Sequence, residues 1–184
     1  GTMHPGMSET EMLAEAQKIK NAGLQGIKLH PDIQDFAVDD PAMIPLYKEC
    51  ADVLHLKILF HCGDARYDRS APKRMANVLD KVPNLFATAA HFGGYSQWDE
   101  AFSILKNYPQ LYFDTCSSLA MLPQERAMQM IEGYGAHRMM FGTDYPLWTL
   151  HSERERFMAL PLSEEDRKQI LFETFSAVYD VKLP

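Results

Sequence analysis

The chain has 184 residues, 46% hydrophobic and 23% charged, which is typical of one soluble globular domain, 1–184, and excludes a disordered or collagen-like chain. Its 18 Lys and Arg against 25 Asp and Glu give a net charge of -7, which opposes binding to nucleic-acid backbones and acidic membranes. No apolar run reaches the roughly 18 residues of a membrane-spanning helix, and the first residues lack a secretory signal pattern. We therefore expect a cytoplasmic protein with neither nucleic acid nor membrane as a partner.

Helices and short apolar strands are expected to alternate along the chain. The first unit is a helix at 8–22, where Ser8 and Glu11 form a capping-box pattern and Gly23 ends the helix, followed by an apolar run at 25–31 closed by proline. The same unit recurs with helices at 42–54, 72–81, 97–107 and 123–134 and strands at 57–61, 85–91, 111–114 and 138–143. A last amphipathic helix is predicted at 163–179. Strands alternating with helices in this way indicate βαβ units and a parallel sheet.

Polar side chains stand at the ends of the predicted strands: His4, His30, His61, His91, Asp114 and Asp144. In an open doubly wound sheet only the strands at the switch point need polar ends, whereas in a (β/α)₈ barrel every strand end faces one mouth. The fold class predicted is therefore α/β, of the (β/α)₈ TIM-barrel type.

Three of these residues are candidates for chemistry. His61 and His91 each follow a strand too apolar to be exposed, and Asp144 ends the run 139–143. Imidazole and carboxylate groups are the donors that metal-assisted hydrolysis needs, to bind the ion and to move protons. Each residue also has a structural alternative: a histidine can be satisfied by a backbone carbonyl, and an aspartate can cap a helix.

The motifs around these residues resemble those of a known family. The segments 26–31, 60–63, 90–94 and 141–146 are similar to those of the amidohydrolase superfamily, in its amidohydrolase 2 or aminocarboxymuconate semialdehyde decarboxylase-like branch. The resemblance implies that His61 is a metal ligand, that Asp144 is a ligand and proton acceptor, and that His91 is an acid/base. The resemblance also raises the question whether Lys28 is carbamylated and bridges two metal ions. Its position two residues before the strand end favours a structural or substrate-binding role instead.

One departure from the family concerns the metal ligands. The family's first strand carries a His-x-His pair, and this sequence contains none. Matching His61 to the fifth strand and Asp144 to the eighth places His30 after the fourth and His4 at the end of the third. We therefore expect an incomplete barrel, with strands 3 or 4 to 8 and their helices, that is the C-terminal part of a larger enzyme. Two ligands fall short of the roughly three of a catalytic zinc site, so metal binding should be weak.

The resemblance implies a metal-dependent hydrolase, with zinc as the expected ion, that acts on a small carboxylated or aromatic substrate. His30 and Arg66 are candidate substrate-binding residues, although Arg66 lies in a charged loop that could simply be solvated. The alternatives are a non-oxidative decarboxylase of the same family, a TatD-like nuclease, which should show a basic groove, and an inactive fragment. Unpaired strand edges in an open barrel predict self-association into a homo-oligomer.

Overall fold

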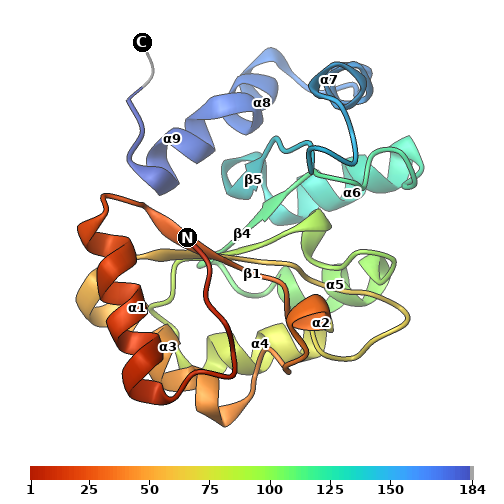
Figure 1. Ribbon diagram of the computed structural model, residues 1–184. Helices are drawn as coiled ribbons and strands as arrows, with labels where there is room; N and C mark the ends of the chain where they lie inside the picture. Colours follow the sequence, from red (N-terminus) through yellow and green to blue (C-terminus); the bar gives the residue numbers. More distant parts are fainter. Residues whose placement is uncertain (183–184) are drawn as a thin grey trace.

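The computed structural model describes residues 1–182, and its centre is a parallel five-stranded sheet (Figure 1). Each strand pairs with the next one along the chain, in the order β1 to β5. The strands are β1 (Gly26–Leu29), β2 (Lys57–Phe60), β3 (Ala87–Ala89), β4 (Leu111–Asp114) and β5 (Met139–Met140). This order, with a helical crossover after each strand, is that of consecutive strands in a (β/α)₈ barrel. The protein is a partial α/β barrel, and the predicted fold class is confirmed.

Helices cover the outer face of the sheet and one of its ends. Helices α1, α3, α4 and α5 surround the strands β1 to β3, whereas α8 and α9 lie beside β5 (Figure 1). The α-helices are α1 (Glu9–Asn21), α2 (Pro31–Gln34), α3 (Ile44–Glu49), α4 (Pro72–Lys81), α5 (Trp98–Leu105), α6 (Gln124–Tyr134), α7 (Leu150–Met158), α8 (Glu164–Lys168) and α9 (Thr174–Tyr179). Short 3₁₀ turns occupy Pro41–Met43, His91–Gly93 and Ala136–Arg138. Among the described residues, no helix is long and apolar enough to cross a membrane.

The elements depart from the sequence prediction in three ways. The strands predicted at 85–91 and 138–143 shorten to β3 and β5, because His91 begins a 3₁₀ turn and Phe141 N donates to Ile170 O outside the sheet. The helices predicted at 42–54 and 163–179 each contain a π-helical segment, at Cys50–Leu54 and Gln169–Glu173. Helices α2 and α7 were not predicted. In α7 the only buried apolar side chain is that of Phe157, which is too little to give an apolar period.

A buried guanidinium fixes the end of the sheet near β5. Arg138 donates to the backbone carbonyl oxygens of Tyr134 and Tyr108, both at 2.6 Å, and of Lys106 at 3.3 Å. These carbonyls belong to the end of α6 and to the turn before β4. Since buried carbonyls need donors, Arg138 holds these two segments at a fixed distance from β5.

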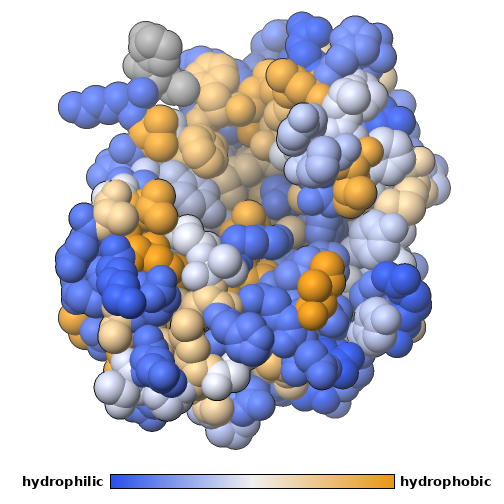
Figure 2. All heavy atoms as spheres, viewed as in Figure 1, coloured by the Kyte–Doolittle hydropathy of each residue, from blue (hydrophilic) through white to orange (hydrophobic). Residues whose placement is uncertain are grey.

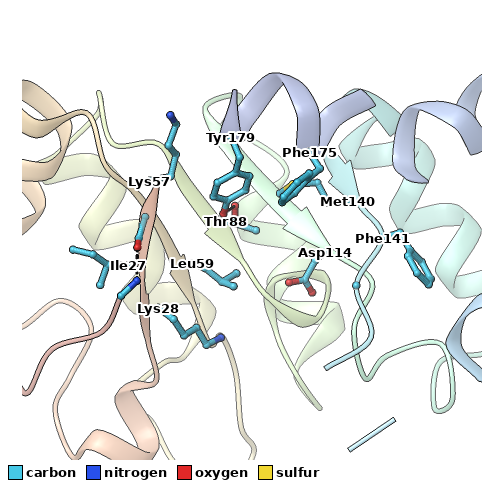
Figure 3. Close-up of a pocket in the computed structure, with 13 residues that line it drawn as sticks. Ile27, Lys28, Lys57, Leu59, Thr88, Asp114, Met140, Phe141, Phe175 and Tyr179 are labelled. Carbon is cyan, nitrogen blue, oxygen red and sulfur yellow. Dashed lines mark hydrogen bonds between the residues drawn. The ribbon is translucent and has the colours of Figure 1, made fainter. Parts of the chain in front are cut away.

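The inner face of the sheet is only partly covered. At its first edge the backbone of Gly1 pairs with β1, through Gly1 N to Gly26 O and Lys28 N to Gly1 O, both at 2.8 Å. At the other edge α9 leans over the strands, and its Tyr179 comes within 3.5 Å of Thr88. Between them lies a hollow of about 400 Å³, lined by strand residues and by α9 (Figure 3). The space-filling view shows apolar residues gathered around this hollow, below the C-terminal helices (Figure 2).

Candidate active site

A second pocket, of about 510 Å³, opens at the carboxyl ends of the strands. All five residues that the sequence proposed as site residues line it: His30, His61, His91, Asp144 and Arg66. They meet because the parallel register places Leu29, Phe60 and Ala89 level with one another, so the residues that follow leave the sheet at the same edge. His4, another predicted strand-end residue, lies outside this pocket, exposed and accepting a hydrogen bond from its own loop at Gly6 N.

The two central histidines are hydrogen-bonded to each other. His61 Nδ1 lies 2.9 Å from His91 Nε2, and His91 Nδ1 lies 3.0 Å from the carbonyl oxygen of Cys116. The backbone N–H of His91 donates to Asp114 at 2.9 Å, so this strand-end carboxylate positions a loop and does not line the pocket. The imidazole of His91 is thereby fixed on both of its nitrogens.

The outer nitrogen of His61 has no hydrogen-bond partner. Nε2 is buried and unpaired among residues 1–182, and a carboxylate oxygen of Asp32 lies 3.7 Å from it. Burial, followed by the neighbouring imidazoles of His91 and His30, lowers the pKa of His61 to about 2. His61 is therefore neutral, with a ring nitrogen that faces the pocket. His30 stacks on it with ring centroids 3.8 Å apart, and burial lowers the pKa of His30 as well.

Asp144 lines the same pocket, near His91. Its carboxylate accepts a hydrogen bond of 2.6 Å from Ser117 Oγ, and Ser117 Oγ in turn accepts one of 3.1 Å from the Trp148 indole N–H. Asp144 and His91 both have left-handed backbone angles, with φ of 56° and 61°. Such a conformation costs roughly 1 kcal/mol or more for a non-glycine residue. The surrounding hydrogen bonds therefore hold both residues in place against local strain.

The structure groups the possible metal donors into two clusters. Among the described residues, the donor atoms of His30, Asp32 and His61 lie within 4.8 Å of one another, and so do those of His91, Cys116 and Asp144. The two predicted ligands, His61 and Asp144, share the pocket but belong to different clusters. Sequence reasoning overlooked Asp32, Cys116 and Ser117. For Asp32 a signal was present, because it follows the strand-end His30 by two residues.

The guanidinium of Arg66, a predicted substrate-binding group, forms an ion pair with a neighbouring carboxylate. Arg66 Nε donates to Asp64 Oδ1 at 2.9 Å and Arg66 Nη2 donates to Asp64 Oδ2 at 2.7 Å. These bonds lower the pKa of Asp64 to about 2. Lys28 also lines the pocket, and no described residue forms an ion pair with it. In Figure 3 its side chain extends across the inner side of the sheet. Among the described residues, Lys28 is therefore a pocket cation without an ion-pair partner, whereas Arg66 is paired with Asp64.

The fold is that of a partial α/β barrel with imidazole and carboxylate groups gathered at its strand ends. A family model described as Amidohydrolase (Amidohydro_2) matches residues 3–180. The chain belongs to this family. No match was found among curated proteins.

Several solved structures share the fold. An uncharacterised TIM-barrel protein from Bordetella bronchiseptica has a TM-score of 0.85 and 26% identity, over 97% of this chain and 64% of that one. A 5-carboxyvanillate decarboxylase from Novosphingobium aromaticivorans, with bound manganese and 3-methoxy-4-hydroxy-5-nitrobenzoic acid, has a TM-score of 0.77 and 14% identity, over 98% and 64%. A Pseudomonas putida protein provisionally described as a 2-pyrone-4,6-dicarboxylic acid hydrolase has a TM-score of 0.71 and 17% identity, over 94% of this chain and 69% of that one. The chain thus spans less than two thirds of the length of the first two.

Proposed function

We propose that the pocket at the strand ends is the active site of a metal-dependent hydrolase that acts on a small carboxylated or aromatic molecule. The observation that carries the proposal is the buried, unpaired Nε2 of the neutral His61, which faces a pocket lined by further imidazole and carboxylate groups. An unpaired buried nitrogen is costly unless a ligand satisfies it. The family match supports the same reading.

The residues present fit a divalent cation. Neutral imidazole nitrogen and carboxylate oxygen are its usual donors, and here His61 and Asp144 are the proposed ligands. When bound, the cation would polarise a substrate oxygen and acidify a water molecule. Zinc is the ion expected from the sequence, and the manganese in a protein of the same fold makes manganese the ion to test beside it.

The chain's own groups supply binding and proton transfer. Lys28 attracts the substrate carboxylate, while Tyr95 and Trp148 wall the pocket. Asp144, held by Ser117, accepts the proton of the attacking water. Asp144 passes this proton to His91 Nε2, which gives it to the leaving atom, so that both groups return to their starting states. For that step its Nε2 exchanges the hydrogen bond with His61 for one to the substrate.

Non-oxidative decarboxylation is the second candidate. It is favoured by one observation, which is that proteins of this fold are described as decarboxylases of hydroxylated benzoates. In this reaction Lys28 would again hold a carboxylate, and His91 would protonate the carbon from which CO₂ leaves. The same residues serve both reactions, so the product distinguishes them.

The test combines metal analysis with a substrate panel. The purified chain, with added Zn²⁺ or Mn²⁺, is offered cyclic esters of dicarboxylic acids and hydroxybenzoates, and acid production and CO₂ release are measured. We expect turnover that is lost in Asp144→Asn and in His91→Asn and kept in His151→Asn, which changes an exposed histidine outside the pocket. Retained turnover in His91→Asn would exclude its acid/base role. No retained metal and no turnover with either ion would refute the function.

A further inference from the structure

A chain of hydrogen bonds reaches the carboxylate of Asp144 from two loops. The indole N–H of Trp148 donates to Ser117 Oγ at 3.1 Å, and Ser117 Oγ donates to Asp144 Oδ2 at 2.6 Å. The direction of both bonds is fixed, because an indole N–H can only donate and a hydroxyl has a single hydrogen, which here goes to the carboxylate. Among residues 1–182, Oδ2 is the Asp144 oxygen that receives a hydrogen bond, which leaves Oδ1 for a proton or a ligand.

The loop after β4 serves both of the groups proposed to move protons. Ser117 is 3% exposed and holds Asp144, while the carbonyl oxygen of the preceding Cys116 lies 3.0 Å from His91 Nδ1. Ser117 has a left-handed backbone, with φ of 55°, which a non-glycine residue adopts only at a cost. In this conformation a hydroxyl and a carbonyl of adjacent residues contact two different side chains of the pocket.

Helix α7 holds the indole ring of Trp148 in turn. The guanidinium carbon of Arg156 lies 4.7 Å from the centroid of this ring, within the range of a cation–π contact. Arg156 is also ion-paired with Glu153, one turn earlier in the helix, whose side chain is fully buried. A buried carboxylate is costly unless it is paired. Because both partners lie on α7, the pair ties the guanidinium, and the indole that it contacts, to this helix.

The other tryptophan of the chain provides an internal comparison. Trp98 donates its indole N–H to the backbone carbonyl oxygen of His91 at 3.1 Å. It supports the backbone of a pocket residue, whereas Trp148 acts through a hydroxyl on a side-chain carboxylate. Hydrogen bonds in a chain polarise one another, so the charge of Asp144 should be felt at the indole proton of Trp148 and not at that of Trp98.

We propose that Ser117 and Trp148 are positioning residues for Asp144, and that Arg156 of α7 acts on the same carboxylate by holding the Trp148 ring. These roles rest on the proposed function, in which Asp144 accepts a proton, and they add the groups that orient it. The carboxylate cannot rotate without breaking its bond to Ser117. The loop after β5 begins at Asp144 and contains Trp148, so the chain of bonds closes this loop onto the loop after β4.

Indole NMR of the full chain tests these bonds without any need for turnover. The two tryptophans give two indole N–H signals, and Trp148→Phe identifies its own signal by removing it. We expect Ser117→Ala to move the Trp148 signal upfield and to speed its hydrogen exchange, and Asp144→Asn to move it in the same direction by less. Ser118→Ala is the matched control, because Ser118 is also buried and its hydroxyl donates to Cys116 O instead. In this control the Trp148 signal should stay in place.

Two spectra would overturn the proposal. A Trp148 signal that is the same in Ser117→Ala as in wild type would mean that the indole does not donate to the hydroxyl. A signal that responds to Ser117→Ala and not to Asp144→Asn would end the chain of bonds at Ser117. For α7, Arg156→Gln should shift the Trp148 signal, whereas Arg154→Gln, which changes an exposed residue of the same helix, should not. Equal spectra of these two variants would remove α7 from the proposal.

Kinetics separate positioning from a purely structural contact. On a substrate that the wild-type chain converts, Ser117→Ala and Trp148→Phe should lower kcat about tenfold or more, with KM nearly unchanged because the pocket keeps its aromatic wall. Where Ser117→Ala melts well below wild type, Trp148→Phe carries the comparison, since it leaves Ser117 in place. Wild-type kcat in both variants would overturn the proposal and leave the hydrolase standing. If the wild-type chain converts no substrate, the proposed function falls, and the indole spectra alone decide whether Ser117 and Trp148 hold Asp144.

Discussion

Replacing Gly63 with alanine should displace the backbone of two loops that form the candidate active site. Gly63 has φ +77°, and a Cβ built on it would lie 2.6 Å from the Cα and carbonyl carbon of Gly94 and 2.7 Å from Tyr95 N. The loop after β2, which follows His61, therefore touches the loop after β3, which follows His91, backbone to backbone. The hydrogen bond from Tyr95 N to Cys62 O, at 2.7 Å, lies at the same contact.

The magnitude follows from comparison with Gly23, which has the same φ of +77° but no atom within 4 Å of the added Cβ. Gly23→Ala carries the left-handed strain alone, about 1 to 2 kcal/mol, partly offset by about 0.4 to 1 kcal/mol from the stiffer unfolded chain. Gly63→Ala adds the cost of pushing two backbones apart, about 1 to 3 kcal/mol. We expect losses of about 1 kcal/mol for Gly23→Ala and about 2 to 4 kcal/mol for Gly63→Ala.

Urea unfolding followed by circular dichroism measures both losses. The free energy of unfolding of Gly63→Ala should lie clearly below that of Gly23→Ala at an unchanged denaturant slope. The metal affinity of Gly63→Ala should also fall, because the distance between His61 and His91 is set by this contact, whereas that of Gly23→Ala should not. Equal losses of stability in the two variants would refute the reasoning that the loops are in direct backbone contact.

Three further perturbations test other parts of the structure. Arg138→Met removes three hydrogen bonds to backbone carbonyls, one of which, that of Tyr108, keeps a second donor in Leu111 N, and should cost about 2 kcal/mol in urea unfolding. Arg138→Lys should recover part of this loss, and a loss within error would contradict the bridging role. Hydrogen bonds from Arg66 lower the pKa of Asp64 to about 2 in the folded protein, against about 4 in the unfolded chain. The ion pair therefore stabilises the folded state fully above about pH 4, and this stabilisation is lost as the pH falls towards 2. Because Arg66 is largely exposed, Asp64→Asn should cost on the order of 1 kcal/mol at pH 7, and the difference from wild type should vanish near pH 2; a gap that persists there would exclude the ion pair as its cause. Thr149 caps α7, and Thr149→Ala should cost about 1 kcal/mol, with Thr149→Ser as the neutral control in the same thermal melts.

Much of the fold follows from local sequence patterns. The five strands and the helices α1, α4, α5 and α6 lie where apolar runs, caps and glycines predict them, because these signals act within one element. The parallel order also follows, since short strands joined by helices have few other arrangements. Helix α7 was not predicted because its only buried apolar side chain is that of Phe157, and its stability comes from contacts elsewhere in the chain. The expected self-association stays a prediction.

The site was predictable as a set of strand-end residues and unpredictable as a geometry. His30, His61, His91 and Asp144 follow the ends of parallel strands, so the sequence alone places them at one edge of the sheet. Their mutual distances and rotations depend on loops that meet only in the folded chain. Ser70 reaches Asp32 across 38 residues, and Ser117 reaches Asp144 across 27. That is why only the tertiary structure separates His61 from Asp144 and sets Asp32 against the unpaired nitrogen of His61.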